Sequence, residues 1–403
     1  MKRRTLLGNA ALLGFGLTAA GGARADTPGV TATEIKIGNT VPYSGPASAY
    51  GSIGRALTAF WKMTNDAGGI GGRRINFISY DDGYVAAKTV EMTRRLIEQD
   101  GVAFLLNPLG TANNTAIQKY VNQRGIPHLF ISSGADKWAN PKDFPWTIGF
   151  GPSYRTEAQI YARYILATKP GAKIGLIYQN DDFGKDYITG LRDVFGADYA
   201  KNVIREVSYE TTDPTVDSQV VSLQSSGADA LVGAATPKFA AQLVRKVFDV
   251  GWRPLFCLSN VSASVASVMN PAGPEKGVGV VTSAYLKEPT DPTWKDDAGM
   301  NEWRAFMKRW MPDSDLADGA YAFGYGVGLT AAQTLRQCDG DFSRENIMRQ
   351  ATNLKNLELP VLLPGVRVDT SPTQYHVMRQ MQLQRWTGTT WKLFGDVLQA
   401  GAA

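Results

Sequence analysis

The chain has 403 residues, with 42 lysines and arginines against 37 acidic residues, and its formal net charge is +5. A chain of this length exceeds what one hydrophobic core usually fills, so we expect two domains or lobes. Four of the basic residues and none of the acidic ones lie in the first 25 residues. Without that segment the net charge is about +1, which removes the charge argument for nucleic-acid binding.

Residues 1–25 have the pattern of an export signal. Basic residues 2–4 are followed by an apolar run at residues 6–20 and by Ala-Arg-Ala at residues 23–25. The apolar run is too short to span a bilayer. The adjacent arginines resemble a twin-arginine export signal, and ordinary Sec export is the alternative. We therefore expect a signal peptide at residues 1–25 and a mature protein in the periplasm.

Short apolar runs alternate with helical patterns from residue 34 to about residue 282. The runs predict strands at residues 35–41, 75–80, 102–107, 126–131, 173–178, 203–209, 228–233 and 277–282. The patterns between them predict helices that include residues 55–65, 86–98, 155–168 and 239–250. Strands separated by helices of this length form right-handed βαβ units, so the sequence predicts parallel sheets with helices on both faces.

The last third of the chain has a different pattern. Residues 297–310 and 319–337 are predicted to be helical, and residues 360–364 form a connector bracketed by prolines. Residues 374–384 and 391–394 are predicted to pair as an antiparallel hairpin. Two α/β lobes with several crossings between them fit this order better than two independent domains in series.

The sequence offers no catalytic or metal-binding motif. Its two histidines, His128 and His376, lie in a predicted strand and in the hairpin, away from any acid–nucleophile set. The glycines of residues 324–328 resemble a dinucleotide loop, but they lie within a predicted helix, where helix packing is the better interpretation. We therefore expect no enzymatic activity, no cofactor and no metal. Cys257 and Cys338 either form a disulfide in an oxidising compartment or remain buried free thiols.

Loops rich in glycine and small hydroxyl residues follow the predicted strands. They are residues 43–51, 107–114, 132–138, 180–184, 233–237 and 259–264. Ligands of open α/β sheets bind outside the carboxyl ends of the strands, so these loops predict a polar small-molecule site. In the first loop Tyr50 stands where a helix begins, and it is either a ring that stacks on a ligand or an aromatic packed beneath the loop.

Three segments in order along the chain carry a family resemblance. SGPASAYG at residues 44–51, NDAGGIGGRRINFISYDD at residues 65–82 and LIYQNDDFGKDY at residues 176–187 resemble the periplasmic solute-binding proteins of the leucine/isoleucine/valine-binding type, which feed ABC transporters. The resemblance covers nearly the whole mature chain. It implies two Rossmann-like lobes with parallel sheets, joined by three hinge crossings, that close around a ligand.

The resemblance also implies how the chain divides and where it binds its ligand. Lobe 1 is expected to hold residues 34–148 and 284–360, and lobe 2 residues 149–283 and 361–398. The ligand-binding residues implied by the resemblance are Tyr50, Gly110, Thr111, Ser133, Gly134, Asp136, Phe183, Ala235 and Asn260.

Several of these positions have roles in the family. Tyr50 matches an aromatic wall, and Gly110 with Thr111 occupies the loop that holds a ligand carboxylate. Ser133 and Gly134 belong to the next loop, which adds a second hydroxyl contact.

Other positions depart from the family pattern. Phe183 and Ala235 stand where many members have aromatic side chains with hydroxyls, which makes the site more apolar and roomier. Asn260 falls where amino-acid binders use a glutamate for the ammonium group of the ligand. An uncompensated cation in a closed cleft is costly, so this change argues against an α-amino acid, although Asp136 could supply a substitute charge.

The predicted function is that of a periplasmic substrate-binding component of an ABC importer. The expected ligand is a small organic acid, an aromatic or other apolar carboxylate, because residues 363–386 further resemble a subgroup associated with aromatic acids. The expected partner is an inner-membrane ABC permease, and the protein is expected to be a monomer. The alternatives are a branched-chain amino-acid or amide binder that uses Asp136 for the ammonium, and a sensory ligand-binding protein.

Overall fold

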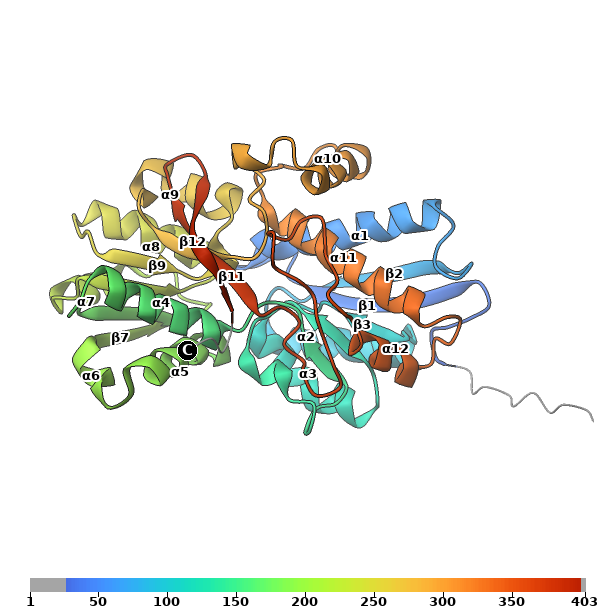
Figure 1. The fold of residues 1–403 in the computed structure, drawn as a ribbon. Helices are drawn as coiled ribbons and strands as arrows, with labels where there is room; N and C mark the ends of the chain where they lie inside the picture. The colour runs from blue at the N-terminus through green and yellow to red at the C-terminus, as the bar shows by residue number, and fades with distance from the viewer. Residues whose placement is uncertain (1–26, 400–403) are drawn as a thin grey trace, which may run out of the picture.

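The computed structural model describes residues 27–399, and these form two α/β lobes that lie side by side (Figure 1). The expected signal peptide, residues 1–25, lies outside the described residues. One sheet has five strands in the order β2-β1-β3-β4-β5, and the other has seven in the order β12-β11-β10-β9-β8-β6-β7. Pairing is parallel except where β11 joins β10 and β12. The expected fold class is confirmed.

The first lobe contains the five-stranded sheet. Its strands are β1 (Glu34–Val41), β2 (Arg74–Asp81), β3 (Phe104–Leu106), β4 (His128–Ile131) and β5 (Thr147–Gly149). Its helices are α1 (Gly51–Asp66), α2 (Ala86–Arg94), α3 (Thr111–Gln123), α10 (Ala298–Trp310), α11 (Gly319–Gln337) and α12 (Arg344–Ala351).

The second lobe contains the seven-stranded sheet. Its strands are β6 (Ile174–Gln179), β7 (Val203–Tyr209), β8 (Ala230–Ala234), β9 (Leu255–Leu258), β10 (Val281–Ala284), β11 (Gln380–Trp386) and β12 (Trp391–Gln399). Its helices are α4 (Tyr154–Thr168), α5 (Asp182–Phe195), α6 (Tyr199–Asn202), α7 (Asp217–Ser225), α8 (Pro237–Asp249) and α9 (Asn270–Ala272).

Most strand expectations are confirmed, with two kinds of difference. The strand expected at residues 277–282 begins later, at Val281, because Pro274–Gly277 forms a 3-10 turn. Strands β5 and β9 were not expected, since three or four buried residues carry too little pattern to distinguish a strand from a loop. The predicted hairpin is present, but its first strand starts at Gln380 rather than at residue 374.

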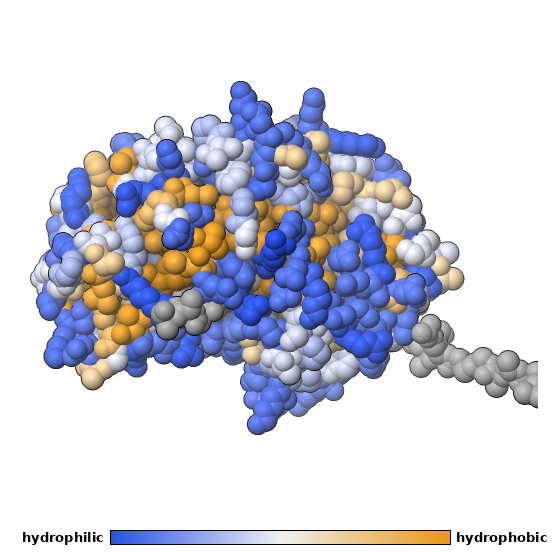
Figure 2. Space-filling model, viewed as in Figure 1, coloured by the Kyte–Doolittle hydropathy of each residue, from blue (hydrophilic) through white to orange (hydrophobic). Residues whose placement is uncertain are grey.

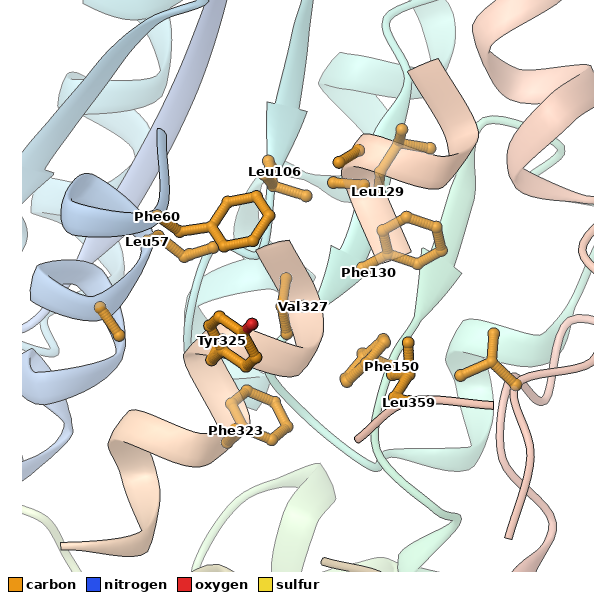
Figure 3. Packing of buried hydrophobic residues seen from close by; sticks show 14 of the residues in the cluster. Leu57, Phe60, Leu106, Leu129, Phe130, Phe150, Phe323, Tyr325, Val327 and Leu359 are labelled. Atoms are coloured by element: carbon orange, nitrogen blue, oxygen red, sulfur yellow. The ribbon is translucent and has the colours of Figure 1, made fainter. Parts of the chain in front are cut away.

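Helices α1 and α11 pack closely over the first sheet. Figure 3 shows Phe60 of α1 beside Tyr325 of α11. The two rings meet edge to face, with 5.8 Å between their centroids. The contact requires glycine on α11, because a Cβ on Gly328 would lie 2.5 Å from the Phe60 ring and one on Gly324 would lie 2.8 Å from the Ala56 side chain. The helix-packing interpretation of residues 324–328 is therefore confirmed.

The chain crosses between the lobes after β5, after β10 and before β11 (Figure 1). At the second crossing Leu363 N–H donates to the Tyr285 carbonyl at 2.9 Å, so the segment that returns from α12 runs beside the segment that leaves β10. Val361, Val368 and Met378 pack in the core of the first lobe. The boundary expected at residue 361 is therefore too early, and the chain enters the second sheet only at β11.

The two cysteines are buried in different places. Cys257 lies in the core of the second lobe and Cys338 in that of the first, and both are free thiols. On the face shown in Figure 2, polar residues dominate the rim, and apolar residues show through toward the middle of the molecule. None of the helices between residues 27 and 399 is long and apolar enough to cross a membrane.

We predict that Gly328→Ala lowers the free energy of unfolding by about 1–3 kcal/mol, because the added methyl group overpacks the contact with Phe60. Gly319→Ala is the matched control on the same helix, since a Cβ there meets nothing within 4 Å. The control is expected to be neutral or slightly stabilising. Urea unfolding of the ligand-free variants measures both, and equal stability of the two would contradict the packing account.

Candidate ligand-binding site

A cleft of about 160 Å³ lies between the lobes, beside the crossings. The loops that follow strands in both sheets line it, together with the residues just after β5 and β10. Seven of the nine residues expected at the site line this cleft: Tyr50, Gly110, Thr111, Ser133, Gly134, Phe183 and Asn260. The structure thus brings these seven together, and their contact with a ligand remains a proposal.

A parallel bridge between Leu109 and Ser132 aligns the loops after β3 and β4. It is extended by Gly110 N–H, which donates to the Ser132 carbonyl at 3.2 Å. Gly110 has a φ of 103°, and a Cβ on it would lie 2.5 Å from Asn113 Oδ1 and 2.8 Å from the Tyr84 ring. Only glycine fits at this position. Helix α3 begins directly after Gly110, and the N–H groups of its first turn have no side-chain cap.

The aligned loops place two hydroxyl groups in contact. Thr111 Oγ1 and Ser133 Oγ lie 2.7 Å apart. Ser133 Oγ also accepts hydrogen bonds from Trp138 Nε1 at 2.9 Å and from Ala135 N–H at 3.2 Å. The Thr111 hydroxyl is therefore held by a neighbouring hydroxyl group that has two further hydrogen bonds of its own.

Aromatic rings form much of the cleft wall. The Tyr50 hydroxyl donates to the Val261 carbonyl at 3.0 Å, a bond that joins the two lobes, and burial raises the pKa of Tyr50 well above its ordinary value. Phe183 packs edge-on against Tyr154, with 4.7 Å between ring centroids. Tyr84, Tyr154, Tyr285 and Phe323 also line the cleft. An apolar ligand body would therefore meet rings from both lobes.

Asn260 lines this cleft, and its side-chain amide lies beside the carboxyl group of Glu157. Its Nδ2 is buried and has no hydrogen-bond partner among the described residues. Its backbone N–H donates at 3.0 Å to the carboxyl group of Glu157, which lies directly behind the lining. A buried donor without a partner is costly, so a ligand acceptor placed there would recover the lost hydrogen bond.

Glu157 is a buried acid that sequence reasoning missed. It lies in the first turn of α4 and is fully buried. Its carboxyl group accepts hydrogen bonds from Tyr161 and Ser283, each at 2.5 Å, and from Tyr187. Burial raises its pKa above the ordinary glutamate value. The group ties α4, α5 and β10 together, and with its oxygens already engaged it is not available to a ligand.

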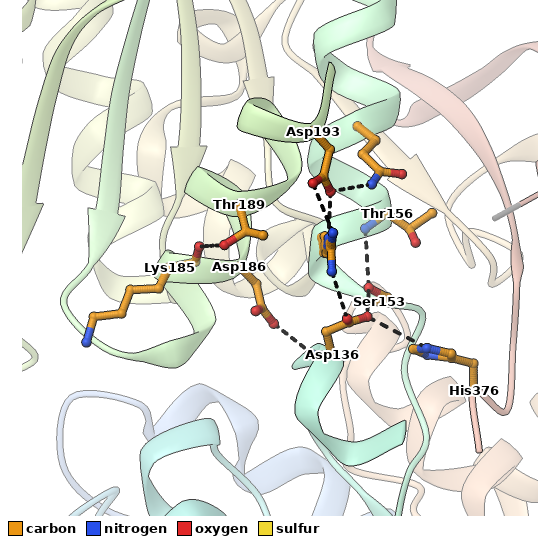
Figure 4. Close-up of polar contacts among 10 residues, drawn as sticks. Asp136, Ser153, Thr156, Lys185, Asp186, Thr189, Asp193 and His376 are labelled. Carbon is orange, nitrogen blue, oxygen red and sulfur yellow. Dashed lines mark hydrogen bonds and ion pairs between the residues drawn. The ribbon is translucent and has the colours of Figure 1, made fainter. Parts of the chain in front are cut away.

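Asp136 and Ala235 were expected at the site, but they do not line the cleft. The Asp136 carboxylate accepts from Ser153 Oγ at 2.9 Å and lies 3.6 Å from Arg155 and 3.7 Å from His376. Figure 4 shows Ser153 and His376 beside this carboxylate. With these partners Asp136 cannot serve the ligand ammonium, which corrects the alternative expected from the sequence.

The Ala235 residue is buried, and its carbonyl group accepts a hydrogen bond from the Ser262 hydroxyl. We expected the small side chain of Ala235 to enlarge the binding site, but Ala235 does not line the cleft and has no such effect.

Two other acids do line the cleft. Glu288 accepts hydrogen bonds from Thr290 at 2.9 and 3.0 Å, and burial raises its pKa to about 7. Asp318 caps α11 through Ala320 N–H at 3.2 Å and accepts from Ser264 Oγ at 3.1 Å. Within residues 27–399 no group of three or more His, Cys, Asp or Glu side chains is arranged to hold a metal ion.

Two of the four aromatic wall residues that the sequence analysis missed lie shortly after a predicted crossing. Tyr154 and Tyr285 come within a few residues of the expected lobe boundaries at 148/149 and 283/284. Since hinge crossings border the interlobe cleft, an aromatic residue just after a predicted crossing was a usable signal. Glu157 had no such signal, because one acid in the first turn of a helix is ordinary.

The family follows from a match over most of the chain. A family model described as periplasmic binding protein matches residues 34–390. The chain belongs to the periplasmic binding protein family. This is a family of binding proteins rather than enzymes, and its fold is that of the resemblance described above.

This periplasmic binding protein is similar to curated relatives over part of their length. It is 25% identical over 233 residues to Leu/Ile/Val-binding protein homolog 3 of Brucella melitensis, a match that covers 55% of this chain and 60% of the relative. It is also 25% identical over 281 residues to homolog 1 of Brucella abortus, which covers 66% of this chain and 74% of the relative.

Solved structures share its fold. The branched-chain amino-acid ABC transporter protein of Thermus thermophilus with bound valine has a TM-score of 0.81 at 15% identity, covering 92% of this chain and 97% of that one. The fatty acid ABC transporter substrate-binding protein of Thermomonospora curvata has a TM-score of 0.77 at 20% identity, covering 94% and 95%.

We predict that Glu157→Gln keeps the fold of the binding protein, because a neutral side chain of the same shape suits a buried site. Since the pKa of Glu157 is raised in the folded state, its ionisation destabilises the folded protein as pH rises above about 4.5. Urea unfolding between pH 4 and 8 should show wild type losing stability with pH relative to Glu157→Gln.

The matched control is Glu157→Leu, which leaves the donors around it unpaired at about 1–3 kcal/mol each and should be strongly destabilised. Wild type gaining stability relative to Glu157→Gln as pH rises would contradict the buried-acid account.

Proposed function

We propose that this protein is the substrate-binding component of an ABC importer and that it captures a small organic carboxylate with an apolar, preferably aromatic, body. The observation that carries the proposal is that the lining of the cleft combines two parts of different chemistry. One part consists of donors, from the Thr111 hydroxyl, the first turn of α3 and Asn260 Nδ2. The other part consists of the aromatic rings that lie beside these donors.

A carboxylate with an apolar body matches both parts. Its oxygens accept from the hydroxyl, the amide and the helix N–H groups, and the positive end of the helix dipole favours its charge. The rings of Tyr50 and Phe183 then flank the apolar body. A cavity of roughly 150 Å³ holds a benzene ring in other proteins, so a cleft of about 160 Å³ suits one ring.

Binding would also favour the closed arrangement of the lobes. Thr111 belongs to the first lobe and Asn260 to the second, so one ligand contacts both. A ligand that binds the closed form better than the open form shifts the equilibrium toward closure. We propose that the closed form, in the periplasm and as a monomer, delivers the solute to an inner-membrane ABC permease.

The structural neighbours support the carboxylate head group. One of them holds valine, and another is described as a fatty acid binder. These two ligands share a carboxylate and differ in the ammonium group. At such low identity the two structures establish only a shared fold, so the proposal rests on the donors of this cleft.

A branched-chain amino acid is the second candidate. The names of the Brucella relatives point to it, and Glu288 and Asp318 are two lining acids that an ammonium could face. Both acids already accept hydrogen bonds from neighbours, which makes them weaker partners than a free carboxylate. A sensory role is distinguished by gene order, since permease and ATPase genes beside this one would favour transport.

The proposal is tested by a thermal-shift screen of the mature protein against aromatic acids, aliphatic acids and branched-chain amino acids. A ligand that binds the folded state raises the melting temperature by mass action. We expect the aromatic acids to give the largest shifts. Leucine or valine raising the melting temperature while every simple acid fails would contradict the proposed ligand class.

Thr111→Ala is expected to lower the affinity for the best carboxylate about tenfold or more, because a hydrogen bond to a charged group is lost. Thr111→Ser keeps the hydroxyl and should bind nearly as well as wild type. Thr215→Ala, at an exposed position away from the cleft, serves as a neutral control. Calorimetric titration measures all three, and unchanged affinity of Thr111→Ala would remove this residue from the site.

Asn260→Asp replaces the free amide donor with a negative charge of nearly the same shape. We expect the affinity for a carboxylate to fall by more than about tenfold, since like charges in a closed interface cost several kcal/mol. Asn260→Ala, which removes the donor without adding charge, should lose less. If Asn260→Asp binds the carboxylate as well as wild type does, Asn260 does not face the head group.

A further inference from the structure

We propose that Trp138 is a positioning residue that fixes the direction of the hydrogen bond between Ser133 and Thr111, so that the proton of Thr111 stays available for the ligand. Trp138 does not line the cleft, and it acts through Ser133. The inference rests on the proposed function, because it requires the head group of a ligand to lie at Thr111.

Counting protons and lone pairs sets the direction. The Ser133 hydroxyl oxygen has two lone pairs and one proton. The indole N–H of Trp138, at 2.9 Å, and the backbone N–H of Ala135, at 3.2 Å, occupy the two lone pairs, and neither group can accept in return. The Ser133 proton is therefore left for one of the two hydroxyl groups beside it, those of Thr111 and Tyr154. Thr111 Oγ1, only 2.7 Å away, is the one that takes it.

The consequence reaches the cleft. Thr111 Oγ1 accepts the proton of Ser133, and its own proton is then free to point at a ligand. Thr111 Oγ1 keeps one lone pair, but its proton is no longer drawn to Ser133, so the hydroxyl group always has a proton to donate to the ligand. A carboxylate presents an acceptor to the Thr111 proton in either orientation, whereas an amide does so only when its carbonyl oxygen, and not its NH2 group, faces that proton.

Packing holds Trp138 in this orientation. The residue is buried with only 2% of its surface exposed, in the 3-10 turn η3 (Asp136–Ala139) that follows β4. A Cβ on Gly149 of β5 would lie 3.1 Å from the Trp138 Cβ, so the neighbouring strand passes close by. The amino group of Lys137 lies over the indole ring, 5.6 Å from its centroid. In this orientation the indole N–H donates to the Ser133 oxygen.

The test measures selectivity between a carboxylate and the primary amide of the same body. The probes are benzoate with benzamide, hexanoate with hexanamide, and 3-methylbutanoate with 3-methylbutanamide, each titrated into the mature protein by calorimetry. Trp138→Phe removes the N–H but keeps most of the ring. It frees a lone pair on Ser133, so Thr111 can turn and accept, and the carboxylate-to-amide affinity ratio should fall about tenfold.

A double-mutant cycle separates this effect from packing. In a Ser133→Ala background the link between Trp138 and Thr111 is absent, so adding Trp138→Phe should leave the affinity ratio unchanged. If Trp138 had a purely structural role, Trp138→Phe would weaken the binding of both ligands of a pair equally, whether residue 133 is serine or alanine. An affinity ratio that Trp138→Phe leaves unchanged when Ser133 is intact therefore overturns the inference.

The outcomes distinguish this inference from the proposed function. A wild-type protein that binds none of the three carboxylates contradicts the proposed function, and this inference falls with it. A wild-type protein that binds a carboxylate, with a ratio that Trp138→Phe does not change, overturns only the role of Trp138. If Trp138→Phe does not fold, Ser133→Ala alone must lower the ratio, because Thr111 is then free to rotate, and an unchanged ratio again overturns the inference.

Discussion

The cleft depends on the parallel bridge between Leu109 and Ser132, which continues the pairing of β3 with β4 beyond the regular strands. This pairing brings the start of α3 beside the loop that carries Ser133, and it can do so only because residue 110 is a glycine with a positive φ. The hydroxyl contact, the free N–H groups of α3 and the orientation of Thr111 all follow from it. A shift of register there would separate the donors that a head group needs.

The second lobe completes the site from the other side of the hinge. Tyr50 reaches the Val261 carbonyl, and Lys137 forms an ion pair with Asp182 at 3.0 Å, so polar contacts already join the lobes in this arrangement. Next to that pair, Asp136 N–H donates at 2.8 Å to Asp186, whose pKa burial raises to about 7. The Asp136 region therefore belongs to the closure of the lobes rather than to the recognition of the ligand.

The sequence was sufficient for the strand–helix alternation and for most loops at the cleft, because both depend on local patterns: apolar periodicity and glycine-rich strand ends. It was insufficient where function depends on packing between distant segments. No local sequence pattern indicates that the Asp136 carboxylate lies against Ser153 and His376, or that the Ala235 carbonyl accepts a hydrogen bond from Ser262. The same holds for Glu157, which accepts hydrogen bonds from three different elements. The sequence likewise did not indicate that residues 361–378 belong to the first lobe, because this depends on which hydrophobic core their side chains pack into.

The central claim is that the donors of this cleft select a carboxylate and offer a ligand ammonium no free partner. Calorimetric titration with matched pairs tests it most directly: 4-methylpentanoate against leucine, and 3-phenylpropanoate against phenylalanine, which differ only in the α-ammonium group. The account predicts tighter binding of the simple acid in each pair, and tightest binding of 3-phenylpropanoate. Tighter binding of leucine and phenylalanine than of their simple acids would contradict it.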